Sequence, residues 1–227
     1  MHAFCYTFSK FVCWLFFRFG FGLEVRGREH VPKRGAFILA CNHVSYLDPP
    51  LVGAACPRRM CFLAQADLYQ RPLLGAFLRS IGAIALRRNE TDLGAIRAAL
   101  WRLREGQPIA IFPEGGRQVS GKLGEAKRGV GLLAISAQVP IIPVLVSGTF
   151  EAWPPHAARL SRAKIRVAFG SSIPYTYGSV QSAVPSGTPV GEQGRAAAAR
   201  DHQKRLAQAV TERWRHLRIE EQRHDHS

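Results

Sequence analysis

The stretch ILACNHVSYLDPPLVG, residues 38–53, joins the pattern of a buried strand to the start of a helix. Its apolar run ends on Asn42 and His43, and Asp48 follows five residues after His43. Short apolar runs are typical of strands in parallel sheets, and clefts in α/β proteins open where such strands end. The stretch therefore predicts an imidazole and a carboxylate at the mouth of a cleft.

The same alternation of apolar runs and helical patterns continues on both sides of this stretch, over residues 24–178. It predicts an α/β fold, with one mixed, mostly parallel sheet flanked by helices in a single domain. We expect strands at 36–41, 60–63, 84–86, 108–112, 141–146 and 165–169. We expect helices at 49–55, 72–81, 92–105 and 129–137.

Residues 1–23 form an aromatic segment that carries two cations, Lys10 and Arg18. A spanning helix needs about 20 residues without central charge, and no window here provides them. As a helix, the segment places Thr7, Lys10, Trp14 and Arg18 on one stripe, with apolar residues around the rest. We predict a membrane-interfacial helix with this stripe at the lipid headgroups. The alternative is a helix packed on the domain's own core.

The C-terminal part divides into a loop or linker at residues 179–194 and a charged helix at 195–227. The linker is rich in Gly, Ser and Pro, which break helices. The helix carries apolar residues at helical spacing, namely Leu206, Val210, Trp214 and Leu217. The pattern fits docking on the domain or lying on the membrane equally well.

The chain is strongly basic, with 31 Lys and Arg against 16 Asp and Glu and a net charge of +15. Such an excess favours an anionic partner. No nucleic-acid-binding motif is present, so we expect lipid surfaces and no nucleic acid. Five cysteines without paired CxxC spacing predict reduced thiols, which suits a cytoplasmic protein. No cluster of His and Cys has zinc-ligand spacing, so we expect no metal.

His43 and Asp48 allow two interpretations. Because Asp48 precedes Pro49, it could simply cap the helix that follows. Alternatively, the carboxylate accepts a hydrogen bond from one imidazole nitrogen and leaves the other basic toward a substrate hydroxyl. Since no Ser or Cys is specified as a nucleophile, the second interpretation implies direct attack by a substrate alcohol.

A second chemical stretch, IAIFPEGGRQVSGKLGEAKRG at residues 109–129, follows another strand. Its turn presents Glu114 and Arg117 beside Gly115, and a guanidinium fork suits a phosphate or carboxylate. The alternative is a Glu–Arg pair on a surface turn. The stretch IGAIALRR, residues 81–88, brings Arg88 as a further candidate for the same anion, or as ordinary surface charge. The stretch VPIIPVLVSGT, residues 139–149, is interpreted as an architectural strand entry.

Together these four stretches resemble the glycerophospholipid acyltransferase family, which includes 1-acylglycerol-3-phosphate acyltransferases. The family carries, in this order, the blocks N-H-x-x-x-x-D, G-x-x-x-I-x-R, F-P-E-G-T-R-S and V-P-I-x-P-V. The matching blocks here begin at Asn42, Gly82, Phe112 and Val139, and Lys127-Arg128-Gly129 resembles a K-x-G segment of the family. The resemblance covers about residues 24–170.

The resemblance implies that His43 removes the proton of a lysophospholipid hydroxyl while Asp48 orients the imidazole. The oxygen then attacks an acyl thioester on coenzyme A or acyl carrier protein, without a covalent acyl-enzyme. Glu114, Gly115, Arg117 and Arg88 would organise the glycerol phosphate. The product would be phosphatidic acid, for phospholipid biosynthesis. No cofactor is implied beyond the thioester co-substrate, and the cytoplasmic face of the inner membrane is the expected location, with monotopic or peripheral attachment.

Two positions depart from the family pattern. Gly116 stands where Thr is usual, and Gln118 where Ser is frequent. Both lie beside the expected phosphate site, so acylation of another lysolipid, such as a lyso-ornithine lipid, stays open. Two further functions fit the same sequence, namely a non-catalytic membrane lipid-binding protein and a hydrolase of acyl thioesters.

Overall fold

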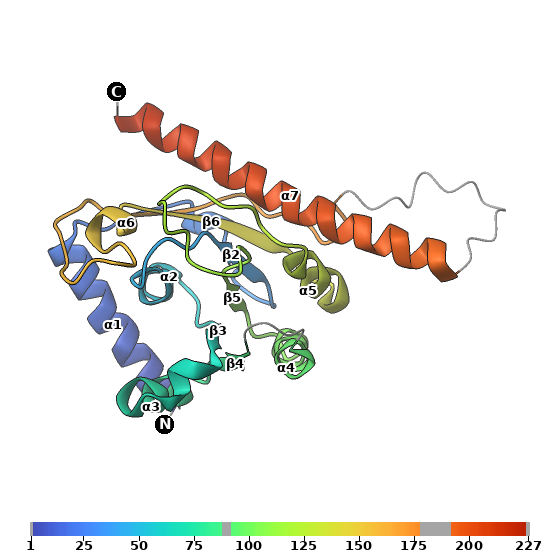
Figure 1. The fold of residues 1–227 in the computed structure, drawn as a ribbon, viewed down its shortest axis with the longest axis horizontal. Helices are drawn as coiled ribbons and strands as arrows, with labels where there is room; N and C mark the ends of the chain where they lie inside the picture. The colour runs from blue at the N-terminus through green and yellow to red at the C-terminus, as the bar shows by residue number, and fades with distance from the viewer. Residues whose placement is uncertain (1, 88–91, 178–191, 226–227) are drawn as a thin grey trace.

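The fold is an α/β sheet with helices on both faces, seen in a computed structural model that describes residues 2–87, 92–177 and 192–225 (Figure 1). The strands are β1 (Glu24–Arg26), β2 (Ile38–Cys41), β3 (Cys61–Gln65), β4 (Ile84–Leu86), β5 (Ile109–Ile111), β6 (Ile141–Ser147) and β7 (Arg166–Phe169). They form one sheet in the order β1-β7-β6-β2-β5-β3-β4. Of these pairings only β6 with β7 is antiparallel. The predicted mixed, mostly parallel sheet is confirmed.

The helices frame this sheet. They are α1 (His2–Gly20), α2 (Asp48–Ala55), α3 (Pro72–Ser80), α4 (Leu93–Arg104), α5 (Gly129–Ala137), α6 (Thr149–Ala152) and α7 (Glu192–Asp225). Two short 3-10 turns, Arg28–His30 and Ala66–Gln70, complete the described elements. The helix expected from residue 195 thus begins three residues earlier, at Glu192.

Strand β2 lies at the centre of the sheet, between β5 and β6. All four of its residues are buried. Leu39 and Cys41 pack with α1 and α2 on one face, while Ile38 and Ala40 pack with α4, α5 and α7 on the other. Burial on both faces explains why this strand has a continuous apolar run and no alternation. The position of this strand also determines where Asn42 and His43, which directly follow it, lie at the end of the sheet.

Helix α1 packs on the domain with one face only. Phe17 and Tyr6 are buried in the core, and the Tyr6 hydroxyl accepts a hydrogen bond from the Met60 amide (3.1 Å). Lys10 Nζ donates to the carbonyl of Cys56, and Trp14 packs against the same core. The core-packing alternative is therefore correct for this face. Lys10 and Trp14 face the domain and are not part of a free headgroup stripe.

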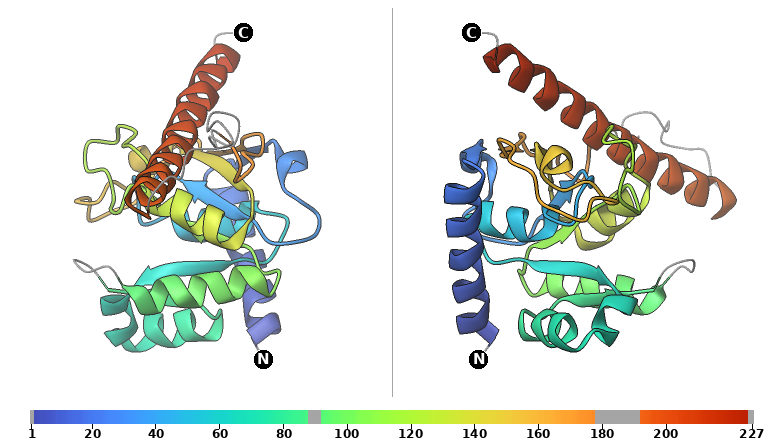
Figure 2. Two further views of the ribbon diagram at one scale, coloured as in Figure 1. Left: turned by 90° about the vertical axis from the view of Figure 1, so that its right-hand side faces the viewer. Right: turned by 60° about the vertical axis from the view of Figure 1, so that its left-hand side comes forward.

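The opposite face of α1 is apolar and exposed. It carries Phe4, Phe8, Phe11, Val12, Phe16 and Phe19. Figure 2 shows α1 standing along one side of the domain while α7 crosses another side and extends past the domain. Within the described ranges, no helix combines the length and apolar character that crossing a bilayer requires.

Helix α7 docks on the domain, which resolves the choice that its sequence left open. Leu206, Val210 and Trp214 are completely buried, and Leu217 is half-buried. Trp214 Nε1 donates to the carbonyl of Ala40 in β2 (3.0 Å). The C-terminal helix therefore supports the strand that precedes the His43 loop.

Four short described elements were not predicted, namely the strand β1, the helix α6 and the two 3-10 turns. Strand β1 has the sequence Glu-Val-Arg and pairs with β7 at the edge of the sheet. Helix α6 has four residues. All five cysteines are free thiols, and Cys41, Cys56 and Cys61 are buried.

Candidate active site

His43 and Asp48 are brought together directly. The His43 Nδ1–H group donates to Asp48 Oδ2 at 2.8 Å. Because Nδ1 is engaged, Nε2 is the imidazole nitrogen left free for a ligand. Asp48 is completely buried, whereas 17% of the His43 side chain is exposed. The pair thus combines an ionisable group that solutes can reach with a carboxylate that they cannot.

Asp48 is held by four hydrogen bonds. Its Oδ2 also accepts from the amides of Val44 (2.7 Å) and Ser45 (2.8 Å). Its Oδ1 accepts from the Thr149 hydroxyl at 2.7 Å. These donors compensate the cost of burying the carboxylate and fix its orientation. Asp48 can therefore hold the imidazole in one tautomer and one position.

Asp48 does not cap α2 with its side chain. The helix begins at Asp48 itself, and Leu47 at the N-cap position makes no side-chain cap. The carboxylate instead turns back toward residues 43–45. The helix-cap alternative is wrong for this reason, although Pro49 occupies the first turn as the dipeptide predicts.

The loop that carries His43 is held by a residue of β6 and by Trp153, which directly follows α6. The Asn42 side chain donates to the Val146 carbonyl (3.0 Å) and accepts from the Val146 amide (2.7 Å). The Ser45 hydroxyl donates to the Trp153 carbonyl (2.7 Å). The stretch 139–149, interpreted from sequence as architectural, therefore also positions the site.

Glu114 lies in the turn after β5, and its side chain is almost completely buried. Burial raises the pKa of its carboxyl to about 7, while the Gln118 side chain and the backbone of His43 and Gly124 act in the opposite direction. Within the described parts of the chain, neither carboxylate oxygen has a hydrogen-bond partner of good geometry. A buried, unsatisfied carboxyl near His43 is available to a polar ligand.

Arg117 stacks on an aromatic ring of the His43 loop. Its guanidinium carbon lies 3.5 Å from the centroid of Tyr46, and Tyr46 in turn lies beside Trp153. Arg117 Nη1 is buried and has no hydrogen-bond partner among the residues described. A guanidinium that is oriented by stacking but keeps a free donor suits an anionic group of a ligand.

The two loops contact each other through backbone and ring. The Gln118 amide donates to the His43 carbonyl (2.8 Å). The Phe112 ring stacks on the His43 imidazole, with centroids 4.3 Å apart. His43, Asp48, Glu114 and Arg117 therefore belong to one site, and the surface-pair alternative for Glu114 and Arg117 does not hold because Glu114 is buried.

Gly115 lets a lysine approach this turn. It has a positive φ of 79°, and a Cβ at this position would lie 2.6 Å from Lys127 Nζ. A side chain here would be strained and would displace Lys127. The glycine thus brings an ammonium group to the exposed side of the Glu114 turn.

Gly116 leaves open space where the family usually has a Thr side chain. A Cβ at this position would meet nothing within 4 Å. The Gln118 side chain extends instead toward Gly124 and Glu114. The Gly116 departure therefore leaves space on the exposed side of the turn, and the Gln118 departure places an amide side chain beside Glu114.

Arg88, the remaining predicted site residue, lies outside the described residues. Thr149, Tyr46 and Phe112 are site residues to which sequence reasoning gave no role. Phe112 and Tyr46 lie inside the recognised blocks, so their positions were a signal. Thr149 gave none, because it lies far from Asp48 in sequence. In the described chain, no three His, Cys, Asp or Glu side chains gather in a way that could hold a metal.

Comparisons with known proteins agree with this fold. The 1-acyl-sn-glycerol-3-phosphate acyltransferase of Bacillus subtilis is 28% identical over 128 residues, covering 56% of this chain and 63% of that protein. The human 1-acyl-sn-glycerol-3-phosphate acyltransferase alpha is 28% identical over 171 residues, covering 74% of this chain and 60% of that protein. The chain thus spans about three fifths of the length of these curated relatives.

A solved structure shares the architecture. The crystal structure of the 1-acyl-sn-glycerophosphate (LPA) acyltransferase PlsC from Thermotoga maritima superposes with a TM-score of 0.67 at 23% identity. The match covers 93% of this chain and 78% of that one. The profile of the family described as Acyltransferase matches residues 22–147, which include His43, Asp48, Glu114 and Arg117. The chain belongs to this acyltransferase family.

Proposed function

We propose that the protein transfers a fatty acyl group from an acyl thioester to the sn-2 hydroxyl of 1-acylglycerol-3-phosphate, producing phosphatidic acid and a free thiol. The thioester carrier is coenzyme A or acyl carrier protein. One observation carries the proposal: the 2.8 Å hydrogen bond between His43 Nδ1 and buried Asp48, beside an arginine with a free buried donor. The names of the bacterial and human relatives support the choice of acceptor.

The proposed chemistry begins at His43 Nε2. This nitrogen takes the proton of the acceptor hydroxyl as the oxygen forms a bond to the thioester carbonyl carbon. The C–S bond of the tetrahedral intermediate then breaks, and the leaving sulfur receives the proton from His43. Asp48 remains ionised and stabilises the imidazolium between these steps. No acyl-enzyme forms.

Binding of the glycerol phosphate is assigned to the second loop. Arg117 Nη1 is the proposed donor to the phosphate, and Lys127 adds a positive charge on the exposed side. Glu114, with its raised pKa, is proposed to hydrogen bond to the acceptor from the buried side. Arg88 stays a proposed contributor to phosphate binding.

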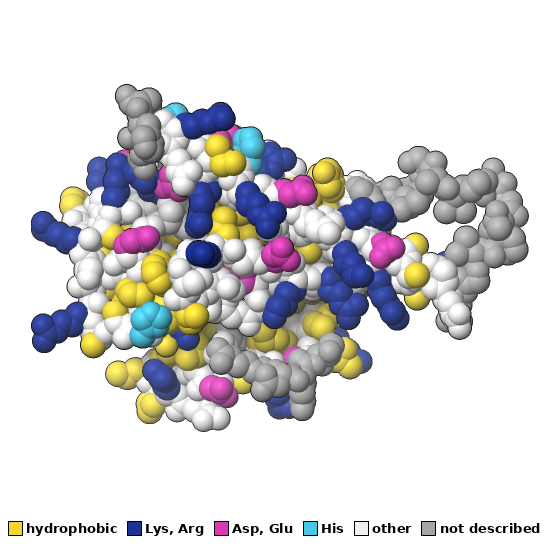
Figure 3. All heavy atoms as spheres, turned by 45° about the horizontal axis from the view of Figure 1, so that its top comes forward, with side chains coloured by type: hydrophobic (Ala, Val, Ile, Leu, Met, Phe, Trp, Pro, Cys, Tyr) yellow, Lys and Arg dark blue, Asp and Glu magenta, His cyan; other side chains and the backbone are white. Residues whose placement is uncertain are grey.

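The proposed location is the cytoplasmic face of the inner membrane, with monotopic or peripheral attachment. The exposed aromatic face of α1 supports contact with acyl chains. Over the face drawn in Figure 3, Lys and Arg side chains are spread widely, and acidic side chains are scattered among them but less frequent. This distribution favours anionic lipid surfaces and an acidic carrier protein.

The proposal is tested with purified protein, an acyl thioester and lysophosphatidic acid, following thiol release and identifying the product by mass spectrometry. We expect His43→Ala to lower turnover by roughly 10²–10⁴-fold, the usual contribution of a general base. His216→Ala is the matched control, because His216 is exposed on α7 and pairs only with Glu220 in the described chain. Equal turnover of both variants would contradict the assignment.

The same assay separates acyl transfer from hydrolysis and from binding alone. Thiol release that does not depend on added lysolipid would indicate a thioester hydrolase. Vesicle binding without thiol release would indicate a lipid-binding protein. A panel of acceptors that includes a lyso-ornithine lipid tests the open space at Gly116, which is the feature that favours a different headgroup.

A further inference from the structure

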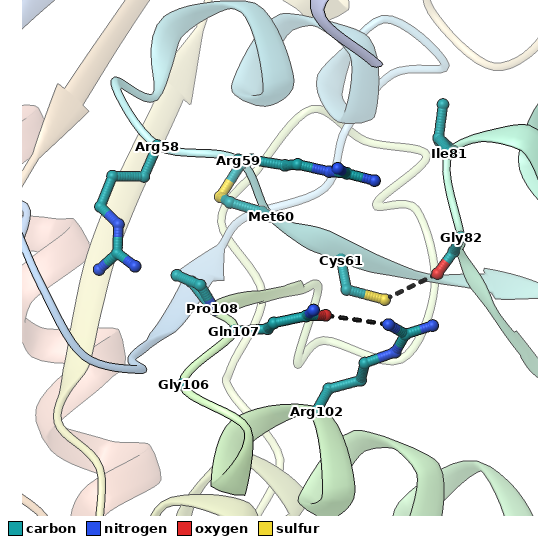
Figure 4. A pocket seen from close by; sticks show the side chains of 10 residues that line it. All are labelled: Arg58, Arg59, Met60, Cys61, Ile81, Gly82, Arg102, Gly106, Gln107 and Pro108. Carbon is teal, nitrogen blue, oxygen red and sulfur yellow. Dashed lines mark hydrogen bonds between the residues drawn. The ribbon is translucent and has the colours of Figure 1, made fainter. Parts of the chain in front are cut away.

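A cavity of about 340 Å³ opens at the end of the strands opposite to the candidate active site. Its walls come from the residues that precede β3, β4 and β5, including Met60, Gly82 and Pro108 (Figure 4). His43 and Glu114 instead follow the ends of β2 and β5. In a parallel sheet these two sets of residues lie at opposite edges, so the cavity is separate from the candidate active site.

The cavity is basic. Three arginines line it, Arg58, Arg59 and Arg102, and no acidic side chain does so among the residues described. Arg58 is turned away, because its Nη1 donates to the carbonyls of Pro32 (3.1 Å) and Gly35. Arg59 and Arg102 extend into the same space from two sides, with Cys61 between them (Figure 4). Both lie close enough to Cys61 to partly offset the rise in its pKa that burial causes.

These two guanidinium groups keep most of their donors free. Arg102 Nη1 donates to Gln107 Oε1 (3.0 Å), and its guanidinium carbon lies 5.1 Å from the centroid of Trp101. Arg59 lies over the Tyr6 ring at 5.2 Å and makes no hydrogen bond or ion pair to any described residue. Aromatic contacts orient both groups without neutralising them. Two such forks facing one space match a phosphate.

Two helices with exposed apolar side chains, α1 and α3, adjoin residues that line the cavity. Tyr6, under Arg59, belongs to α1, whose outer face carries exposed phenylalanines. Ile81 and Gly82 in the wall directly follow α3, whose last turn carries Phe77, which is 41% exposed. Apolar side chains beside paired cations match the boundary between acyl chains and lipid phosphates.

We propose that the Arg59–Arg102 cavity binds the phosphate of an anionic phospholipid in the membrane that α1 and α3 contact. This lipid is a docking ligand, distinct from the acyl acceptor at His43. The proposal rests on the membrane location in the proposed function, and it adds a specific lipid site and a second contact helix, α3.

The test compares two double variants of the full chain that remove the same charge. Arg59→Gln with Arg102→Gln empties the cavity of its free cations. Arg97→Gln with Arg104→Gln removes two exposed cations from α4, the helix that carries Arg102. Binding is measured by co-sedimentation with vesicles of neutral phosphatidylcholine, alone or with phosphatidylglycerol. Thermal stability with added inorganic phosphate, at constant ionic strength, tests the soluble anion.

We expect the cavity variant to lose at least fivefold more affinity for phosphatidylglycerol vesicles than the control variant, with no difference on neutral vesicles. Equal losses in the two variants would overturn the site. Stabilisation by inorganic phosphate that the cavity variant lacks, without a vesicle effect, would overturn the lipid as ligand. If the double variant does not fold, Arg102→Gln against Arg104→Gln gives the same comparison.

Enzymatic activity and vesicle binding, measured on the cavity variant and on His43→Ala, test the lipid site and the proposed acyl transfer separately. The cavity variant should acylate detergent-dispersed lysophosphatidic acid at the wild-type rate, because its substitutions lie at the opposite sheet edge. His43→Ala should bind phosphatidylglycerol vesicles as the wild type does. A cavity variant without detergent-dispersed activity would contradict the separation of the two sites.

Discussion

Thr149 is the residue whose replacement best separates positioning from chemistry. Its buried hydroxyl donates a hydrogen bond to Asp48 Oδ1. Among the described residues, Thr149 makes no hydrogen bond to His43 itself. We expect Thr149→Val to lower kcat about tenfold and stability by about 1.5–3 kcal/mol, the cost of losing a hydrogen bond to a charged group. Thr149→Ser restores the hydroxyl and should restore kcat.

Kinetics and urea unfolding of the two Thr149 variants provide the measurement. KM for lysophosphatidic acid should change little, because Thr149 acts on the carboxylate and not on the acceptor. A wild-type kcat in Thr149→Val would show that the hydroxyl has no positioning role, because Val keeps the methyl group of Thr149 and removes only the hydroxyl.

Glu114 provides a prediction on pH. Burial raises the pKa of its carboxyl from an ordinary value of 4.5 to about 7, so the folded state binds a proton more tightly than the unfolded chain. This group therefore makes the free energy of unfolding fall as pH rises from 4.5 to about 7. Glu114→Gln removes that fall, which amounts to at most about 3 kcal/mol.

The measurement is urea unfolding of the wild type and Glu114→Gln at the two ends of this pH range. The stability of the variant relative to the wild type should increase with pH and level off above neutral pH. A stability difference that is the same at both ends would show that the Glu114 carboxyl titrates at its ordinary pKa.

At the scale of elements, α1 has two faces with two different expected effects. Phe17 is 1% exposed and Phe8 and Phe11 are more than half exposed. We expect Phe17→Ala to lower the free energy of unfolding by about 3–5 kcal/mol, as in other large-to-small core substitutions. Phe8→Ser with Phe11→Ser should leave unfolding unchanged but weaken vesicle binding at least tenfold, since burying each Phe contributes about 1.5–3 kcal/mol.

Chemical unfolding and vesicle co-sedimentation measure the two effects separately. The membrane role of α1 would be contradicted if the exposed-face variant bound vesicles normally. Deleting the helix is the poorer experiment, because Phe17, Tyr6 and Lys10 tie it to the core and truncation would destabilise the domain.

The elements differ in how far the sequence could predict them. β2 and β6 are buried on both faces, so their apolar runs were visible without other information. β1 was missed because Val25 is its only apolar residue. Its hydrogen-bonding partner, β7, is also far away in sequence, so no local pattern indicates the strand. The stripe of Lys10 and Trp14 was placed wrongly, because helical periodicity shows which residues share a face but not which neighbour that face meets.

The candidate site shows the same limit. His43 and Asp48 were predictable as a pair because they are close in sequence and follow one strand. Thr149 and Val146 reach the same loop from α6 and β6, across contacts that only the folded sheet creates. The docking of Trp214 on Ala40 was hidden for the same reason.

For the whole molecule, the net charge of +15 gives a prediction on salt. The extra affinity for phosphatidylglycerol over neutral vesicles should largely disappear between about 0.1 and 1 M NaCl, since the Debye length falls from about 10 to 3 Å. The affinity for neutral vesicles should persist, because it comes from the aromatic face of α1 and from α3. Titrations at the two salt concentrations provide the measurement, and loss of both affinities together would indicate purely electrostatic attachment.

The clamp between Asn42 and Val146 has a consequence for biosynthesis. During translation, the His43 loop leaves the ribosome long before β6, the strand that holds it. The reason is that β2 and β6 are neighbours in the sheet, whereas Asn42 and Val146 are 104 residues apart in sequence. A nascent chain that ends before β6 therefore contains both His43 and Asp48 but lacks Val146, whose hydrogen bonds to Asn42 fix their loop. Competence for the proposed acyl transfer should arise only once β6 has been synthesised and has paired with β2.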